Sequence, residues 1–230
     1  MQAPTVLLFD IDGTLITTGG VGRRAIERAV TEVLGLELTR FPFPFGGMVD
    51  PVIVSEGLRA LGVEPSPQMV SEVLEHYIPV LEDEVRTATT YAVHEGVVEV
   101  LDAVSNLEGV AVGLGTGNIE LGARVKLERV GLNPYFAFGG YGSDAAQRPA
   151  LIGHGARLGA DLLERPLDQC RLVIIGDTPR DVEAAHANGG ECVAVSTGGS
   201  TFEELESAGP EYLFQTLAER GALEAILEGA

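Results

Sequence analysis

The chain alternates short apolar runs with longer stretches of helical pattern, and this alternation limits the folds open to it. Five runs are rich in Val, Ile, Leu or Phe and end in glycine or aspartate: 5–12, 110–117, 136–142, 171–177 and 192–199. Runs that are apolar on both faces are typical of strands buried in a parallel sheet. The stretches between the later runs read as helices: 95–107, 118–131, 148–160 and 179–189. The pattern predicts an α/β fold with a doubly wound parallel sheet, extended at its edge by 211–217.

The segment 16–91 interrupts this alternation and is too long for an ordinary connection between a strand and a helix. It holds three helical patterns, at 20–35, 51–62 and 67–86. Asp50, which precedes Pro51, reads as the N-cap of the second helix. We therefore predict two units, a core formed by 1–15 and 92–230 and an inserted α-helical cap domain over 16–91.

The charge balance of the chain excludes several classes of partner. Its 230 residues include 34 acidic and 15 basic side chains, for a net charge of −19, and Lys126 is the only lysine. Nucleic acids and anionic membranes both require a basic face, so neither is expected as a partner. No apolar stretch approaches the ~20 residues of a membrane span. We expect a cytoplasmic protein, present as a monomer or a homodimer.

Acidic and hydroxyl side chains stand where the predicted strands end. Asp10 and Asp12 stand at the end of the first run, Thr116 at the end of the second and Asp177 at the end of the fourth, with Asp181 four residues later. Ligands of open parallel sheets bind beyond the carboxyl ends of the strands, so these side chains should converge. Four carboxylates in one cleft repel one another unless a cation lies among them. Oxygen ligands favour a hard ion, and we predict Mg²⁺.

These residue types are suited to the chemistry of phosphate esters. An aspartate carboxylate can attack phosphorus and form an aspartyl-phosphate. A second carboxyl group nearby can protonate the leaving oxygen and later take a proton from water. The hydroxyl of Thr116 and the backbone N–H groups at the start of the following helix can bind phosphoryl oxygens.

Three motifs in this order resemble the haloacid dehalogenase (HAD) superfamily of phosphatases. They are DIDGT from Asp10, GTGN from Gly115 and GDTPRD from Gly176, each at the end of a predicted strand. The resemblance covers the chain from Asp10 to about Gly199 and implies a Rossmann-like core. The helical insert after the first motif is similar to the type 1 cap of phosphoglycolate phosphatases and β-phosphoglucomutases.

The resemblance implies a role for each matching residue. Asp10 corresponds to the nucleophile, whose carboxylate also binds Mg²⁺. Asp12 corresponds to the general acid/base, with its backbone carbonyl on the metal, and Thr116 to the phosphate-binding hydroxyl. Asp177 corresponds to a metal ligand. Asp181 corresponds either to a further ligand or to an acid that orients water on the metal.

The third motif of the superfamily departs from its usual form in this chain. Members normally place a lysine, often before proline, ahead of the helix that precedes the fourth strand, where this chain has Arg148 and Pro149. The planar guanidinium of arginine also binds phosphate, so Arg148 is the predicted cation of the site. Lys126 is the alternative, but it falls within the helix after the second motif.

Three further residues are candidates for binding the phosphate or the rest of the substrate. Gly117 and Asn118 follow Thr116, although this pair is also common in turns. Arg23, or alternatively Arg24, near the start of the first cap helix, could reach an anionic group of the substrate across the cleft.

The sequence thus predicts a Mg²⁺-dependent phosphatase that hydrolyses a small phosphorylated metabolite through an aspartyl-phosphate. A sugar phosphomutase would use the same intermediate and is the nearest alternative. A receiver-like domain that binds phosphate without turnover is a second alternative. Receivers, however, are shorter, have no inserted cap and use a lysine at a later strand end.

Overall fold

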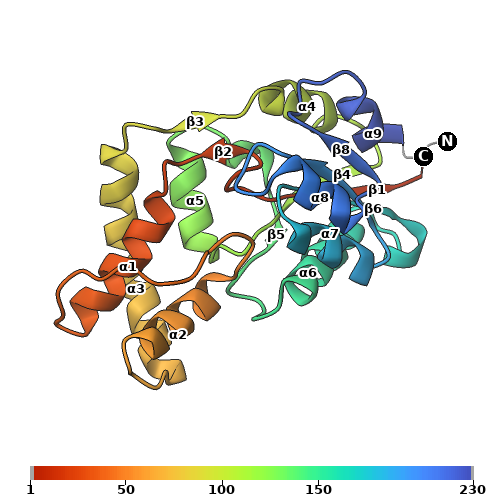
Figure 1. Cartoon of the computed structure of the whole chain (residues 1–230). Coiled ribbons are helices and arrows are strands. Elements are labelled where there is room, and N and C mark those ends of the chain that lie inside the picture. Colours follow the sequence, from red (N-terminus) through yellow and green to blue (C-terminus); the bar gives the residue numbers. More distant parts are fainter. Residues whose placement is uncertain (1–2, 229–230) are drawn as a thin grey trace.

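A six-stranded sheet, parallel throughout, forms the centre of the computed structural model, which describes residues 3–228 (Figure 1). Its strands, in spatial order, are β5 (Gly139–Gly140), β4 (Val110–Gly115), β1 (Thr5–Phe9), β6 (Arg171–Gly176), β7 (Glu191–Val195) and β8 (Tyr212–Phe214). The predicted doubly wound parallel sheet is confirmed, with β8 as the edge strand. The predicted core limits at residues 1 and 230 lie outside the described residues.

The sheet is buried on both faces, as its continuous apolar runs require. In β1, Leu7 and Phe9 belong to the hydrophobic cluster on one face, and Val6 and Leu8 to the cluster on the other. All four side chains are fully buried. Because successive side chains of a strand point to opposite faces, only a strand covered from both sides can be apolar at every position.

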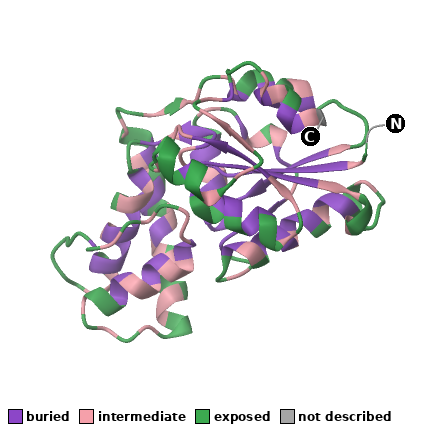
Figure 2. Ribbon diagram, turned by 45° about the vertical axis from the view of Figure 1, so that its right-hand side comes forward, coloured by how far each residue is buried: buried purple, intermediate pink, exposed green. Residues whose placement is uncertain are grey.

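Helices cover both faces of the sheet, and Figure 2 shows the strands almost wholly buried between them. One face packs against α4 (Val97–Val104), α5 (Glu120–Glu128) and α9 (Ala222–Glu228). The other packs against α6 (Arg148–Leu162), α7 (Pro179–Ala187) and α8 (Phe202–Ala208). Two short 3₁₀ helices, η1 (Asn133–Tyr135) and η2 (Leu167–Gln169), lie in the connections. Within residues 3–228, no helix is long and apolar enough to cross a membrane.

The predicted cap, residues 16–91, contains the three helices expected from the sequence, and they pack around a hydrophobic cluster that also includes Ile119 from outside this segment. They are α1 (Val21–Val33), α2 (Asp50–Ala60) and α3 (Pro67–Thr87), which lie to one side of the sheet with α5 beside them (Figure 1). Tyr77 and Leu81 of α3 are fully buried there. The chain leaves the core through β2 (Ile16–Thr17) and returns through β3 (Ala92–Val93), and these two short strands pair antiparallel. The sequence patterns did not indicate this pair.

Two local predictions are wrong. The run 136–142 forms a strand only at Gly139–Gly140, which pairs with Leu114 and Gly115 of β4, because the 3₁₀ helix η1 ends directly before Phe136. Asp50 is not the N-cap of α2: Val49 takes that position, and Asp50 is the first helical residue. Pro51 follows within the first turn, where the missing N–H of proline is tolerated.

Replacing Gly140 with alanine should destabilise the core. A Cβ at this position would lie 1.9 Å from the carbonyl oxygen of Leu151, because α6 packs directly on β5. Such overpacking lowers the free energy of unfolding by about 1–3 kcal/mol. Urea denaturation should show this loss for Gly140→Ala. It should show little change for Gly199→Ala, whose Cβ would meet no atom within 4 Å. Equal stabilities for the two variants would contradict this account of the packing.

Candidate active site

A cavity of about 480 Å³ lies beyond the carboxyl ends of β1, β4 and β6, between the core and the cap. Its core wall carries Asp10, Asp12, Thr116, Arg148 and Asp177. Its cap wall carries residues of α1, of α2 and of the segment between them. The volume is typical of sites that enclose a small organic molecule. The predicted site residues therefore meet at one edge of the sheet, as the strand order requires.

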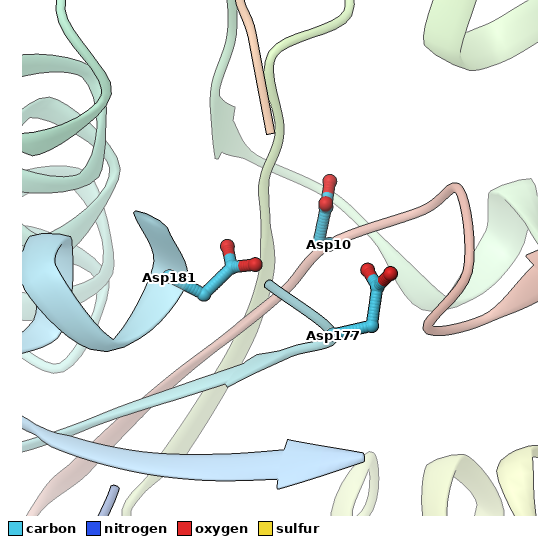
Figure 3. Close-up of side chains that lie close together, drawn as sticks. All are labelled: Asp10, Asp177 and Asp181. Atoms are coloured by element: carbon cyan, nitrogen blue, oxygen red, sulfur yellow. The ribbon is translucent and has the colours of Figure 1, made fainter. Parts of the chain in front are cut away.

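Three of the predicted carboxylates form a compact buried cluster. Oxygen atoms of Asp10, Asp177 and Asp181 all lie within 4.8 Å of one another. Figure 3 shows the three side chains converging from the ends of β1 and β6 and from the start of α7. A Cβ at Gly13 or Gly198 would lie within 2.4 Å of a carboxylate oxygen of Asp177. The backbone of both neighbouring loops therefore approaches this acid more closely than other residue types permit.

The electrostatics of this cluster fit a divalent cation. Burial raises the pKa of Asp10, and the charge of Asp181 raises it further, while Arg148 acts in the opposite direction. Burial, with the charges of Asp10 and Asp181, holds the pKa of Asp177 well above its usual value. A hard ion bound by these oxygens would reverse both effects by favouring the ionised carboxylates. Oxygen ligands of this kind suit Mg²⁺.

Arg148 links the nucleophile position to α7. Its Nη2 lies 2.7 Å from Oδ2 of Asp10 and 2.5 Å from Oδ1 of Asp181, and its Nε donates to the same Oδ1 at 2.8 Å. The other oxygen of Asp181 accepts from the N–H and hydroxyl of Thr178, at 3.1 Å and 2.7 Å. Asp181 is thus engaged by protein donors on both oxygens. This arrangement favours a role in holding Arg148 against Asp10.

Asp12 lies in the same cavity but is paired with a different cation. Nζ of Lys126 donates to Oδ2 of Asp12 and to Oδ1 of Asn118, both at 2.6 Å. The amide nitrogen of Asn118 donates to Oδ2 of Asp12 at 3.0 Å. Burial raises the pKa of Asp12. The charge of Lys126 and the hydrogen bonds from Lys126, Asn118 and Thr18 together have a larger effect in the opposite direction, so the pKa lies below its usual value. The sequence favoured Arg148 over Lys126 as the cation of the site. In the structure both side chains belong to it.

The loop after β4 places a hydroxyl donor beside Asp10. Oγ1 of Thr116 is buried and accepts from the backbone N–H and the side-chain amide of Asn118, at 3.3 Å and 2.8 Å. Its own proton is then left to donate, and a bond from this hydroxyl lowers the pKa of Asp10. Gly117 has a steric role, because a Cβ there would lie 2.1 Å from the carbonyl oxygen of Met48 in the cap.

Arg23 lies at the cap wall of the cavity, but its guanidinium is engaged within the cap. Nη1 contacts Oε1 of the buried Glu27 at 2.8 Å, and Nη2 donates to the carbonyl oxygen of Phe43 at 2.5 Å. The guanidinium also lies 4.0 Å above the ring of Phe45. A direct contact of Arg23 with substrate stays a prediction.

Comparison with known proteins identifies the family. A family model of haloacid dehalogenase-like hydrolases matches residues 7–186. The chain belongs to this family. The match confirms the resemblance carried by the three motifs, and with it the prediction of an enzyme of the HAD phosphatase type.

Relatives of this HAD hydrolase include two proteins named as phosphatases. The chain is 28% identical to the probable phosphatase IndB of Dickeya dadantii, over 97% of this chain and 95% of that protein. It is 27% identical to the phosphoglycolate phosphatase of Pectobacterium atrosepticum, over 93% and 89%. The crystal structure of CbbY from Rhodobacter sphaeroides in complex with phosphate superposes with a TM-score of 0.76 at 20% identity, covering 98% of this chain and 99% of that one. This last likeness shows a shared fold.

Mg²⁺ should raise the unfolding temperature of this hydrolase through the acidic cluster. A ligand that binds only the native state stabilises it by about 2.7 kcal/mol at a hundred times its dissociation constant. Differential scanning fluorimetry should show a Tm that climbs with Mg²⁺ concentration for the wild type. The shift should disappear in Asp177→Asn and persist in Asp161→Asn, which alters an exposed acid in the last turn of α6. In EDTA, Asp177→Asn should unfold no lower than the wild type, since it replaces a buried acid whose ionised form burial and the charges of Asp10 and Asp181 disfavour.

Proposed function

We propose that this HAD hydrolase is a Mg²⁺-dependent phosphatase that cleaves a small phosphorylated metabolite through an aspartyl-phosphate on Asp10. The observation that carries the proposal is the position of Asp10. It lies in the cavity beyond the strand ends, paired with Arg148 at 2.7 Å and within 4.8 Å of the other acids of the cluster. A nucleophile beside cationic groups is the arrangement that attack on an anionic phosphoryl group requires.

The metal would be held by Asp10 and Asp177, with Asp181 as a further ligand or as the group that orients Arg148. When bound, Mg²⁺ neutralises part of the phosphoryl charge and holds the group in place for attack. The family resemblance assigns a further contact to the backbone carbonyl of Asp12, which stays a prediction.

Asp10 and Thr116 act in the first step. A carboxylate oxygen of Asp10 attacks phosphorus, and the bond between phosphorus and the ester oxygen breaks. The hydroxyl of Thr116, which accepts from Asn118 and faces Asp10, can turn its own hydrogen bond to a phosphoryl oxygen of the substrate. Arg148 and the backbone N–H groups that follow Thr116 stabilise the charge on the transferring group.

Asp12 moves the proton in both steps. Because Lys126 keeps Asp12 ionised at rest, Asp12 first accepts the proton of a monoanionic phosphoryl group and passes it to the leaving oxygen. In the second step water attacks the aspartyl-phosphate, and Asp12 takes the proton of that water. The second step frees Asp10 and yields inorganic phosphate.

The segment 16–91 would act as a cap that closes over the reacting groups. Gly19 and Gly20, with φ values of +62° and +80°, stand where the chain enters this segment. Glycine accepts such angles without strain, so the position suits a hinge. Closure excludes water other than the one that reacts and commits the substrate to the site.

Purified enzyme should hydrolyse p-nitrophenyl phosphate with Mg²⁺ and lose this activity in EDTA. Asp10→Asn should lower kcat by at least about a thousandfold, because the amide is not a nucleophile toward phosphorus. Asp161→Asn should retain the wild-type rate. The reaction should release inorganic phosphate, whereas a phosphomutase would return the phosphoryl group to a sugar phosphate. Full activity in EDTA or in Asp10→Asn would overturn the proposal.

Removal of the ammonium group next to Asp12 should slow the reaction. Lys126→Met leaves the carboxylate of Asp12 without its cation, and we expect kcat to fall by about a hundredfold, a typical size for a proton-transfer defect. Lys126→Arg should not restore the rate, because Lys126 is buried and a Cβ at Gly22 would already lie 3.0 Å from its Nζ. Glu120→Gln, in the first turn of the same helix, is the control and should keep the wild-type kcat. A Lys126→Met enzyme with unchanged kcat would exclude this role.

A further inference from the structure

The cap contributes one carboxylate to the cavity wall, that of Asp50. Asp50 is buried, and its Oδ2 accepts a hydrogen bond from the backbone N–H of Ile119 at 2.9 Å. Within residues 3–228, its Oδ1 has no hydrogen-bond donor and neither oxygen has an ion-pair partner. An ionised carboxylate in such a position needs a compensating group, which a bound ligand can supply.

The cations of the cavity are already committed to other acids. Each of the three basic side chains in its wall has a carboxylate partner within 2.8 Å. These pairs are Arg148 with Asp10, Lys126 with Asp12, and Arg23 with Glu27. The proposed metal would compensate Asp177. Asp50 is then the one acid of the described cavity wall that neither an ion pair nor the proposed metal compensates.

The surroundings of Asp50 strengthen its effect on a ligand. Ile26 and Ile53 of the cap line the same cavity, and apolar neighbours reduce the screening of a charge. Burial raises the pKa of Asp50 to about 6, while Lys126 acts to lower it. The carboxylate is therefore mostly ionised at neutral pH.

The position of Asp50 within the enzyme separates it from the reacting groups. It belongs to α2, whereas the nucleophile and its cations come from the core. Its backbone N–H donates to the carbonyl oxygen of Gly117 at 2.8 Å, so the carboxylate sits where the cap meets the phosphate-binding loop. A substrate whose phosphoryl group lies beside Asp10 would turn its organic part toward this wall.

We infer that Asp50 determines substrate specificity, and that the preferred phosphomonoester carries a positively charged amine on its organic part, whereas a second anionic group is disfavoured. The inference rests on the proposed phosphatase activity and adds the chemical class of the substrate. The ammonium group would donate to Oδ1 of Asp50. A carboxylate or a second phosphate in that place would meet a like charge.

The test compares phosphomonoesters with three different chain ends, each at two chain lengths. Alkyl phosphates of two and four carbons, ending in an ammonium, a methyl or a carboxylate group, are assayed with wild-type enzyme and Mg²⁺. We expect kcat/KM for the ammonium compound to exceed that for the methyl compound by about tenfold or more, the usual range for a charged hydrogen bond. The carboxylate compound should be the poorest. A wild type that prefers the carboxylate compound at both lengths would overturn the inference.

Variants then assign the preference to Asp50. Asp50→Asn keeps an oxygen for the N–H of Ile119, and the ratio of kcat/KM between ammonium and methyl compounds should fall toward one. Asp50→Glu should retain part of the preference. Glu56→Gln, which removes an exposed acid from the same helix, should leave the ratio unchanged.

The assay with p-nitrophenyl phosphate separates the two proposals. If Asp50→Asn hydrolyses this compound but keeps the wild-type ratio, the inference fails and the phosphatase function stands. If the wild type does not hydrolyse it, the proposed function fails and the inference falls with it. Circular dichroism establishes that each variant is folded.

Discussion

The ion pair network of Arg148 is the interaction on which the rest of the site depends. A buried guanidinium and two buried carboxylates are stable only together, because removal of one partner leaves an uncompensated charge. Arg148 begins α6, Asp10 ends β1, and Asp181 lies in the first turn of α7. The network thus ties three elements from distant parts of the chain to one point. The positions of Asp10 and of the candidate metal ligands follow from it.

A second cation places Asp10 and Asp12 in separate environments. Asp10 shares its surroundings with other acids, and its pKa is raised. Asp12, two residues later, is bound by Lys126, and its pKa is lowered. Pairs of acids whose environments move their pKa values in opposite directions are typical of sites where one group reacts and the other transfers protons. The short spacing in the sequence therefore does not imply a shared environment.

The parts of this structure that depend on local chemistry were predictable from the sequence. Periodicity identified the parallel sheet and the cap helices, and the polar strand ends identified the acids, because each signal lies within a few residues. The contact between Lys126 and Asp12 joins positions 114 residues apart, so no local pattern contains it. The same applies to Asp50. Its place next to Pro51 indicates a helix start, while its place in the cavity wall depends on how the cap packs against the loop after β4.

The single lysine of this enzyme limits where reagents directed at amines can modify its side chains. Apart from the α-amino group, the chain has one primary amine, and it is buried where Asp12 and Asn118 hold it. Since Lys126 is the one lysine of the sequence, acylation of a lysine side chain would occur at this position alone. Modification of Lys126 would require the cap to open or the chain to unfold. Its rate of acylation would therefore report how often the cavity opens, without the need for a substrate.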